Sequence, residues 1–243
     1  MSDTFCTTRW SVVAAAGRPA ASPGQARDAR VALSELCAAY WPPLYAYARR
    51  TGVGPHDAAD LVQGFFARLL EKGDLSAADP ARGRFRAWLV VAFRNFTANA
   101  RDRQRALKRG GGRVPLRIDA DAAESLYAPE PADTRTPDVE FERRWALTVL
   151  ARALERLAAE QARAGKQAEF EALRPWLVGG GEEGGYARLA GVIGRSEDAL
   201  KVAVHRLRRR YGELLREEVA GTLADPREVA EELAALMAAL SAR

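Results

Sequence analysis

The stretch YARLAGVIGRSEDALKVAVHRLRRRY (residues 186–211) holds two helical patterns that meet at a glycine. Gly194 can adopt the positive φ angle that a tight turn between helices often needs, and Ser196 is a favourable N-cap for the second helix. Apolar residues recur in that helix at intervals of three or four positions and are expected to face a core: Leu200, Val204, Leu207 and Tyr211. The stretch therefore predicts a helix-turn-helix.

The polar side chains of the second helix decide what such a motif could bind. A recognition helix enters the DNA major groove with its amino-terminal residues at the base edges. Base contacts are accordingly expected from Arg195, Glu197, Asp198 and Lys201, and phosphate contacts from Arg206, Arg208, Arg209 and Arg210. The alternative is an amphipathic helix whose arginine-rich face is only solvated, which a single helix-turn-helix pattern does not exclude. A lone histidine such as His205 is typical of a surface position.

Basic residues also gather in a second segment. Residues 82–113 hold ten lysines and arginines against one acidic residue, although the whole chain has a formal charge of only +5. Aromatic residues are interleaved with these arginines: Phe85, Trp88, Phe93 and Phe96. Cations beside aromatic rings suit unpaired nucleic acid, because bases stack on the rings while phosphates meet the charges. The alternative is that these rings belong to the hydrophobic core. Two basic patches in an otherwise acidic chain favour a polyanionic partner.

Apolar residues recur every three to four positions along most of the chain, which predicts an all-α fold of two small helical domains joined by a flexible linker. The expected order is an amino-terminal extension (1–24), a helical domain (25–110), a linker (111–138), a second helical domain (139–220) and a carboxy-terminal helical extension (221–243). In the first domain we expect four helices, the first ending near Trp41-Pro42-Pro43 because proline interrupts helices.

Several classes of function lack support in the sequence. Cys6 and Cys37 show neither metal-ligand spacing nor a disulfide framework, and His56 and His205 have no partners at ligand spacing. The stretch GGGEEGG (179–185) lacks the lysine of a phosphate-binding loop. No apolar run reaches the roughly 18 residues of a membrane helix. We therefore expect no catalytic residues, no metal, no cofactor and no membrane association, and a cytoplasmic location.

Three motifs, taken in order, resemble the sigma-70 family of bacterial RNA polymerase sigma factors. They are DAADLVQGFFARLL (57–70), FRAWLVVAFRNFTANARDRQR (85–105) and the helix-turn-helix stretch. Each motif alone is moderately specific, and their order and spacing strengthen the resemblance. The chain is most similar to the compact extracytoplasmic-function (ECF) group, which keeps only the second and fourth conserved regions. The resemblance covers about residues 31–110 and 141–217.

The resemblance implies a role for particular residues. The family's helix that docks on the clamp of the polymerase β′ subunit matches Asp60, Leu61, Gln63, Phe66, Arg68 and Leu69. The segment that recognises and opens the −10 element in the family corresponds to the loop at 73–83 and to Arg84, Arg86, Trp88, Arg94 and Asn95. The fourth region reads the −35 element, and that role falls on Arg195, Ser196, Lys201, His205 and Arg206.

The chain also departs from the family pattern. Gly64 stands where the family usually has an acid, and Asn99 replaces a common aspartate. The leucine-proline turn that usually precedes the first helix of the fourth region is absent. The sequence therefore does not decide whether this region contacts the polymerase β flap. An additional carboxy-terminal helix is expected, with Asp225 as its N-cap and one apolar stripe: Val229, Leu233, Leu236, Met237 and Leu240. This helix could pack on the core, form oligomers or bind a regulator such as an anti-sigma factor.

The resemblance implies a promoter-specificity subunit that binds core RNA polymerase and promoter DNA and performs no chemistry of its own. The alternative is a stand-alone helix-turn-helix regulator that binds duplex DNA without polymerase. The stretch DLVQGFFARLL (60–70) distinguishes the two, since a stand-alone regulator would not need a polymerase-docking helix.

Overall fold

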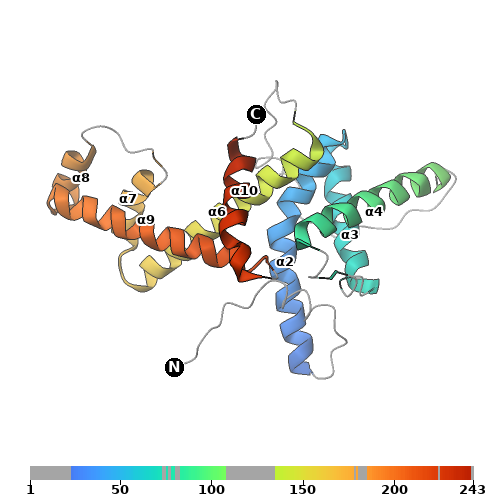
Figure 1. Ribbon diagram of the computed structural model, residues 1–243, viewed down its shortest axis with the longest axis horizontal. Coiled ribbons are helices and arrows are strands. Elements are labelled where there is room, and N and C mark those ends of the chain that lie inside the picture. The colour runs from blue at the N-terminus through green and yellow to red at the C-terminus, as the bar shows by residue number, and fades with distance from the viewer. Residues whose placement is uncertain are drawn as a thin grey trace. The chain divides into compact units, whose positions relative to one another are not determined.

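The computed structural model describes residues 23–72, 75, 78–79, 83–107, 135–177, 179, 185–223 and 225–241. Every element within these ranges is a helix, which confirms the all-α prediction (Figure 1). The extension at 1–22, most of the loop at 73–83 and the linker segment 111–134 lie outside the described residues.

The chain divides into two compact units. Unit 1 is Met1–Thr148 together with Val219–Arg243, and unit 2 is Val149–Glu218. The helices of unit 1 are α2 (Pro23–Arg50), α3 (Pro55–Lys72), α4 (Phe85–Leu107), the first part of α6 (Pro137–Arg163), the short 3-10 helix η3 (Pro226–Glu228) and α10 (Val229–Ser241). The division thus falls inside α6, and the carboxy-terminal helix belongs to the same unit as the amino-terminal helices.

Helix α2 continues through two adjacent prolines. The predicted end near Pro42 and Pro43 is wrong, because α2 runs on to Arg50. A proline inside a helix costs about 3 kcal/mol through a lost hydrogen bond and a clash. The side chains on either side of the pair are almost fully buried, with Tyr40 and Leu44 both 0% exposed. Burial of this face outweighs the local preference of the prolines.

Aromatic rings form much of the core of unit 1. The centroid of Phe93 lies 5.2 Å from that of Phe65 and 6.0 Å from that of Tyr47, and Tyr40 lies 5.4 Å from Phe85. All three pairs are edge-to-face, a favourable arrangement of ring quadrupoles. Phe85 and Phe93 are 2% and 0% exposed. For these two rings the core alternative is therefore confirmed.

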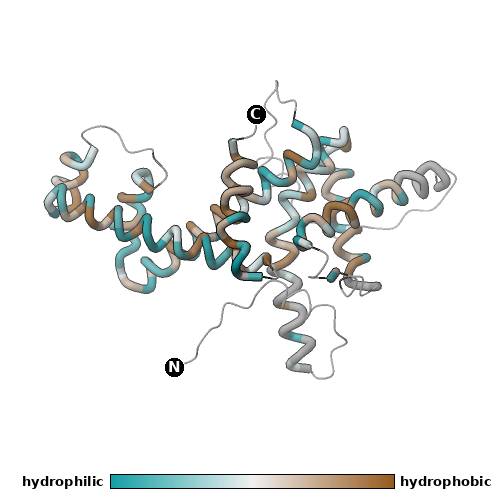
Figure 2. The backbone as a smooth tube through the Cα atoms, viewed as in Figure 1, coloured by the Kyte–Doolittle hydropathy of each residue, from teal (hydrophilic) through white to brown (hydrophobic). Residues whose placement is uncertain are grey.

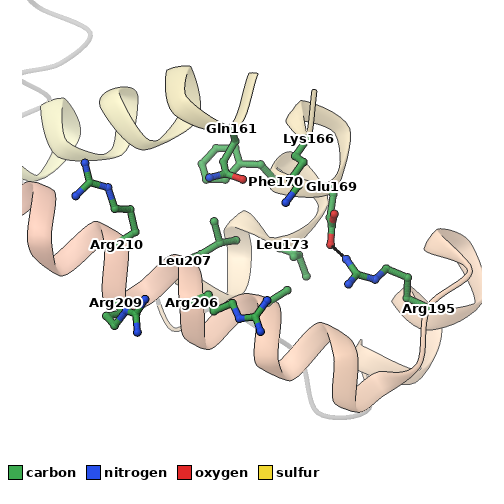
Figure 3. A pocket seen from close by; sticks show the side chains of 11 residues that line it. Gln161, Lys166, Glu169, Phe170, Leu173, Arg195, Arg206, Leu207, Arg209 and Arg210 are labelled. Carbon is green, nitrogen blue, oxygen red and sulfur yellow. Dashed lines mark hydrogen bonds and ion pairs between the residues drawn. The ribbon is translucent and has the colours of Figure 1, made fainter. Parts of the chain in front are cut away.

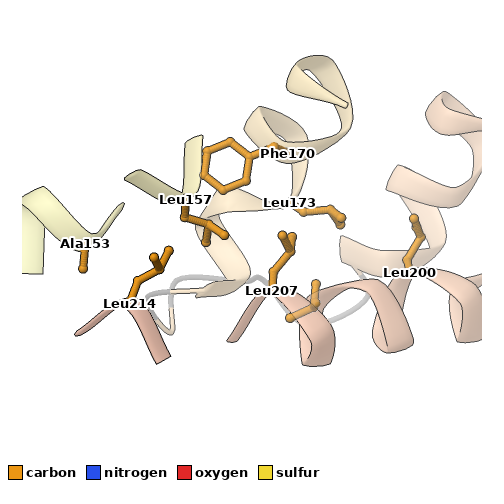
Figure 4. Close-up of a cluster of buried hydrophobic side chains, with 8 residues drawn as sticks. Ala153, Leu157, Phe170, Leu173, Leu200, Leu207 and Leu214 are labelled. Atoms are coloured by element: carbon orange, nitrogen blue, oxygen red, sulfur yellow. The ribbon is translucent and has the colours of Figure 1, made fainter. Parts of the chain in front are cut away.

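Unit 2 is built on the second part of α6, α7 (Gln167–Leu177), α8 (Gly185–Ile193) and α9 (Glu197–Ala220). Hydrophobic residues recur between hydrophilic ones along α6 and α9, as amphipathic helices require (Figure 2). Their buried side chains meet in one cluster: Ala153, Leu157, Phe170, Leu173, Leu200, Val204, Leu207 and Leu214. In Figure 4, Leu157 of α6 and Phe170 of α7 face Leu207 of α9. This cluster fixes which face of α9 is turned outward.

Candidate nucleic-acid interface

The predicted helix-turn-helix is present and consists of α8, a turn at Gly194 and α9. Gly194 has a φ angle of 73°, in the left-handed region that favours glycine. The hydroxyl oxygen of Ser196 accepts a hydrogen bond from the backbone amide of Ala199 at 3.3 Å. This bond satisfies one of the free amides at the start of α9. The turn and the N-cap predicted from the sequence are both confirmed.

One face of α9 is anchored in the core of unit 2. Leu200 and Val204 are 0% and 3% exposed. Tyr211 donates a hydrogen bond from its hydroxyl to the backbone carbonyl of Leu150 at 3.1 Å, and burial raises the pKa of Tyr211. The opposite face of the helix is therefore solvent-exposed along its amino-terminal half.

The DNA-binding residues predicted in the turn before α9 and along α9 are all exposed: Arg195, Ser196, Glu197, Asp198, Lys201, His205, Arg206, Arg208 and Arg209. The amine of Lys201 lies 3.4 Å from a carboxylate oxygen of Asp198 and 3.9 Å from one of Glu197. Exposed ion pairs one turn apart contribute only about 0.3–0.5 kcal/mol. Lys201 can therefore exchange these carboxylates for a DNA group at little cost.

Two arginines near this surface are held by other helices. The guanidinium of Arg208 donates a hydrogen bond to the backbone carbonyl of Trp176 at 3.1 Å. Arg210, expected at a phosphate, instead pairs with Glu160 of α6 at 2.8 Å and with Glu213 and Glu217 of α9 at 3.1 and 3.3 Å. These carboxylates raise the pKa of Arg210. Arg210 therefore fastens α9 to α6, and its expected role as a phosphate contact is not supported by its position.

A basic groove of about 300 Å³ lies beside α9 (Figure 3). It is lined by cations of three segments: Lys166, Arg195, Arg206, Arg209 and Arg210. Arg195 forms an ion pair across the groove with Glu169 of α7. Lys166 and Glu169 were not among the residues predicted for the interface. They come from the turn and helix before the motif, so only their packing beside α9 reveals them.

In unit 1 the predicted −10 residues at the start of α4 are engaged within the protein. Arg86 is 5% exposed. Its guanidinium donates a hydrogen bond to Glu142 of α6 at 2.8 Å, pairs with Glu232 of α10 and lies over the ring of Trp145 at 4.3 Å. Burial lowers the pKa of Arg86, and the charge of Glu142 opposes this effect. In this conformation Arg86 is not on the surface where a −10 contact requires it.

Arg84 takes part in the same cluster. Its guanidinium lies 2.9 Å from Glu232 and 3.3 Å from Glu231, both in α10. The carboxylate of Glu232 is 0% exposed, a state that proteins tolerate when the charge is paired. Glu232 was not among the residues predicted for a site. Its position could have indicated burial, since Glu232 lies three residues after Val229 and four before Leu236, on the buried face of α10.

Farther along α4, predicted −10 residues reach the surface. Arg94 and Asn95 are exposed, and Trp88 is half-buried with its ring stacked 5.5 Å from Phe85. A pocket of about 220 Å³ between α3 and α4 is lined by Trp88, Asn95, Phe96, Asn99 and Arg68, among others. This side of α4 thus combines ring faces with amide groups, the pairing that suits unstacked bases.

Helix α3 presents only part of the predicted polymerase contact. Asp60 is exposed, and Leu61, Gln63 and Arg68 are half-buried. Phe66 is 6% exposed and belongs to the core of unit 1, so its position does not offer a docking contact. A Cβ at position 64 would lie 3.4 Å from the ring of Phe96 in α4, an ordinary contact distance, so the packing of α3 on α4 does not require glycine there.

In the described part of the chain, no group of three or more His, Cys, Asp or Glu side chains could hold a metal ion. None of the helices described is both long enough and apolar enough to cross a membrane.

The comparisons with known proteins concern unit 1. Residues 36–107, which include the end of α2 and all of α3 and α4, match the family model described as Sigma-70 region 2. No curated protein and no solved structure matches the chain. Residues 36–107 are therefore similar to the region 2 domain of sigma-70 proteins, and this similarity supports membership of the chain in the sigma-70 family.

Proposed function

We propose that the chain is a sigma factor of the ECF type, which binds core RNA polymerase and directs it to promoters. The observation that carries the proposal is the joint presence of a region 2 match at 36–107 and a helix-turn-helix at Gly185–Ala220. In this proposal the protein works in the cytoplasm and acts by binding alone, with no catalysis.

Polymerase binding is assigned to the outer face of α3. Asp60 is exposed, and Leu61, Gln63 and Arg68 are accessible beside it. The proposed partner is the clamp of the β′ subunit, which these residues would contact through two opposite charges, the amide of Gln63 and the apolar side chain of Leu61. Phe66 supports this face from the core and is not part of the contact.

Recognition and opening of the −10 element are assigned to α4. Asn95 and the half-buried Trp88 line the pocket between α3 and α4, and the exposed Arg94 precedes Asn95 in the chain. An unstacked base could rest against Trp88 while Arg94 meets a phosphate. Arg84 and Arg86 can join this contact only when their present carboxylate partners leave.

Reading of the −35 element is assigned to α9. Arg195, Ser196, Glu197, Asp198 and Lys201 lie at its amino-terminal end, where a recognition helix meets base edges. His205, Arg206, Arg208 and Arg209 follow on the exposed side and would meet the phosphate backbone.

The test is reconstitution of the protein with core RNA polymerase and genomic DNA of the source organism, followed by sequencing of transcript 5′ ends. Start sites that share −35 and −10 motifs absent from core-only reactions are expected. If the protein does not bind core polymerase but binds duplex DNA tightly by itself, the stand-alone regulator is the correct assignment.

A further inference from the structure

The carboxy-terminal helix α10 places acidic side chains on basic residues of region 2. Arg84 lies 3.3 Å from Glu231 and 2.9 Å from Glu232, and Arg86 also pairs with Glu232. A carboxylate and a DNA phosphate offer the same kind of acceptor oxygen to a guanidinium group. Glu231 and Glu232 therefore occupy positions that DNA phosphates would need.

The contact between α10 and α4 is built mainly on charge. The buried residues of α10 are Leu236 and Glu232, while Val229, Leu233 and Leu240 are only half-buried and Met237 is 58% exposed. A helix with few buried apolar side chains is a candidate for local opening at a modest free-energy cost. Glu232 compensates the buried charge of Arg86. When Arg86 exchanges Glu232 for another anion, α10 loses an ion pair that keeps it on α4.

We propose that α10 is an intramolecular competitor of DNA, which masks Arg84 and Arg86 until DNA phosphates displace Glu231 and Glu232. The masked arginines are assigned to the −10 contact, so the biological meaning of the competition rests on the proposed function. The competition itself is a property of the isolated protein and does not require polymerase.

The proposal is tested with Glu231→Lys, which places a cation beside Arg84 and disfavours the closed position of α10. The side chain of Glu231 is 77% exposed, so the fold should tolerate the change. Glu228→Lys is the matched control, because it makes the same charge change at an exposed position of η3. Circular dichroism verifies that both full-length variants are folded.

The first measurement is the dissociation constant for a fluorescein-labelled single-stranded dT20 oligonucleotide, by fluorescence anisotropy at 150 mM salt. The Glu231→Lys protein is expected to bind at least fivefold more tightly than the Glu228→Lys protein. Equal affinities for the two variants, or no binding by either, overturn the proposal.

The second measurement uses the unaltered protein and follows amide hydrogen exchange in α10. Saturation with dT20 should speed exchange in Val229–Ser241 several-fold, because bound DNA displaces the helix. Unchanged exchange in α10 with dT20 bound overturns the proposal. Failure to bind core polymerase would remove the sigma-factor assignment and leave both of these measurements interpretable.

Discussion

The guanidinium carbon of Arg86 lies 4.3 Å from the ring centroid of Trp145, within the range of a cation–π contact. The same guanidinium donates a hydrogen bond to Glu142 and pairs with Glu232. One side chain of α4 therefore joins the first part of α6 to α10, and the side chains of Arg86 and Glu232 are almost fully buried.

Arg86→Ala should destabilise unit 1, because it removes the contacts with Glu142 and Trp145 and leaves Glu232 with Arg84 as its remaining cation. The expected loss in the free energy of unfolding is about 1–3 kcal/mol, measured by urea denaturation followed by circular dichroism. Arg94→Ala removes an exposed arginine from the same helix and should change stability little. Similar losses in the two variants would contradict the structural role of Arg86.

Lys201→Ala and Arg209→Ala should weaken DNA binding in different ways. Lys201 lies near the amino end of α9, so its loss should cost about 1–3 kcal/mol at particular base pairs of the −35 element. The side chain of Arg209 is 73% exposed and is proposed to contact a phosphate. Its loss should lower the affinity for any duplex and reduce the slope of log K against log salt concentration by about 1. Binding titrations on matched and scrambled duplexes distinguish these patterns, and identical losses would argue against base readout by Lys201.

Asp60→Ala should reduce the affinity for core polymerase by about tenfold, because it removes an exposed charge from the proposed docking face of α3. Asp57→Ala, one turn earlier on the same helix and also exposed, is the control and should have a smaller effect. Surface plasmon resonance with immobilised core enzyme measures both. If the Asp57 variant loses more affinity than the Asp60 variant, the docking face is wrongly placed.

Two glycines should respond to alanine in opposite directions. Gly64 lies within a helix, and an alanine Cβ there would be at ordinary contact distance, 3.4 Å, from Phe96. Gly64→Ala should therefore stabilise the protein by up to about 1 kcal/mol through helix propensity. Gly194→Ala should destabilise it by about 1 kcal/mol or more, since φ is 73°. Thermal unfolding of both variants is the measurement, and a stabilising Gly194→Ala would contradict the turn.

The pairing of Glu160 with Arg210 should make stability depend on pH. The hydrogen bond from Arg210 holds the pKa of Glu160 below its ordinary value of 4.5. The folded-state pKa is the lower one, so this stabilisation is present above the unfolded-state pKa and is lost as pH falls through the folded-state pKa. Glu160→Gln should lower stability at pH 7, and its difference from the unaltered protein should shrink below pH 4.5. Glu155→Gln, at an exposed position of α6, is the control for the change of charge.

The local motifs of this fold were predictable because neighbouring residues determine them. The turn at Gly194, the cap at Ser196 and the buried stripe of α9 each follow from a few adjacent positions. The exposed side of α9 could be assigned for the same reason, since a helix with one buried face has a defined opposite face.

Features that depend on distant residues could not be predicted. Helix α2 continues through Pro42 and Pro43 because Tyr40 and Leu44 are buried in the core of unit 1. The residues next to the two prolines do not indicate this burial. Arg86 looks like a DNA contact in the sequence, and only the return of Glu232 from the other end of the chain makes it internal. The same holds for Arg210, whose partner Glu160 lies 50 residues away.

The membership of α10 in unit 1 has a consequence for biosynthesis. Unit 2 draws all its residues from one continuous stretch, 149–218, whereas unit 1 needs residues from both ends of the chain. During synthesis, domains fold as units once their residues have emerged. On the ribosome, Arg86 cannot pair with Glu232 until Glu232 has been translated, so unit 2 can finish folding before unit 1 does.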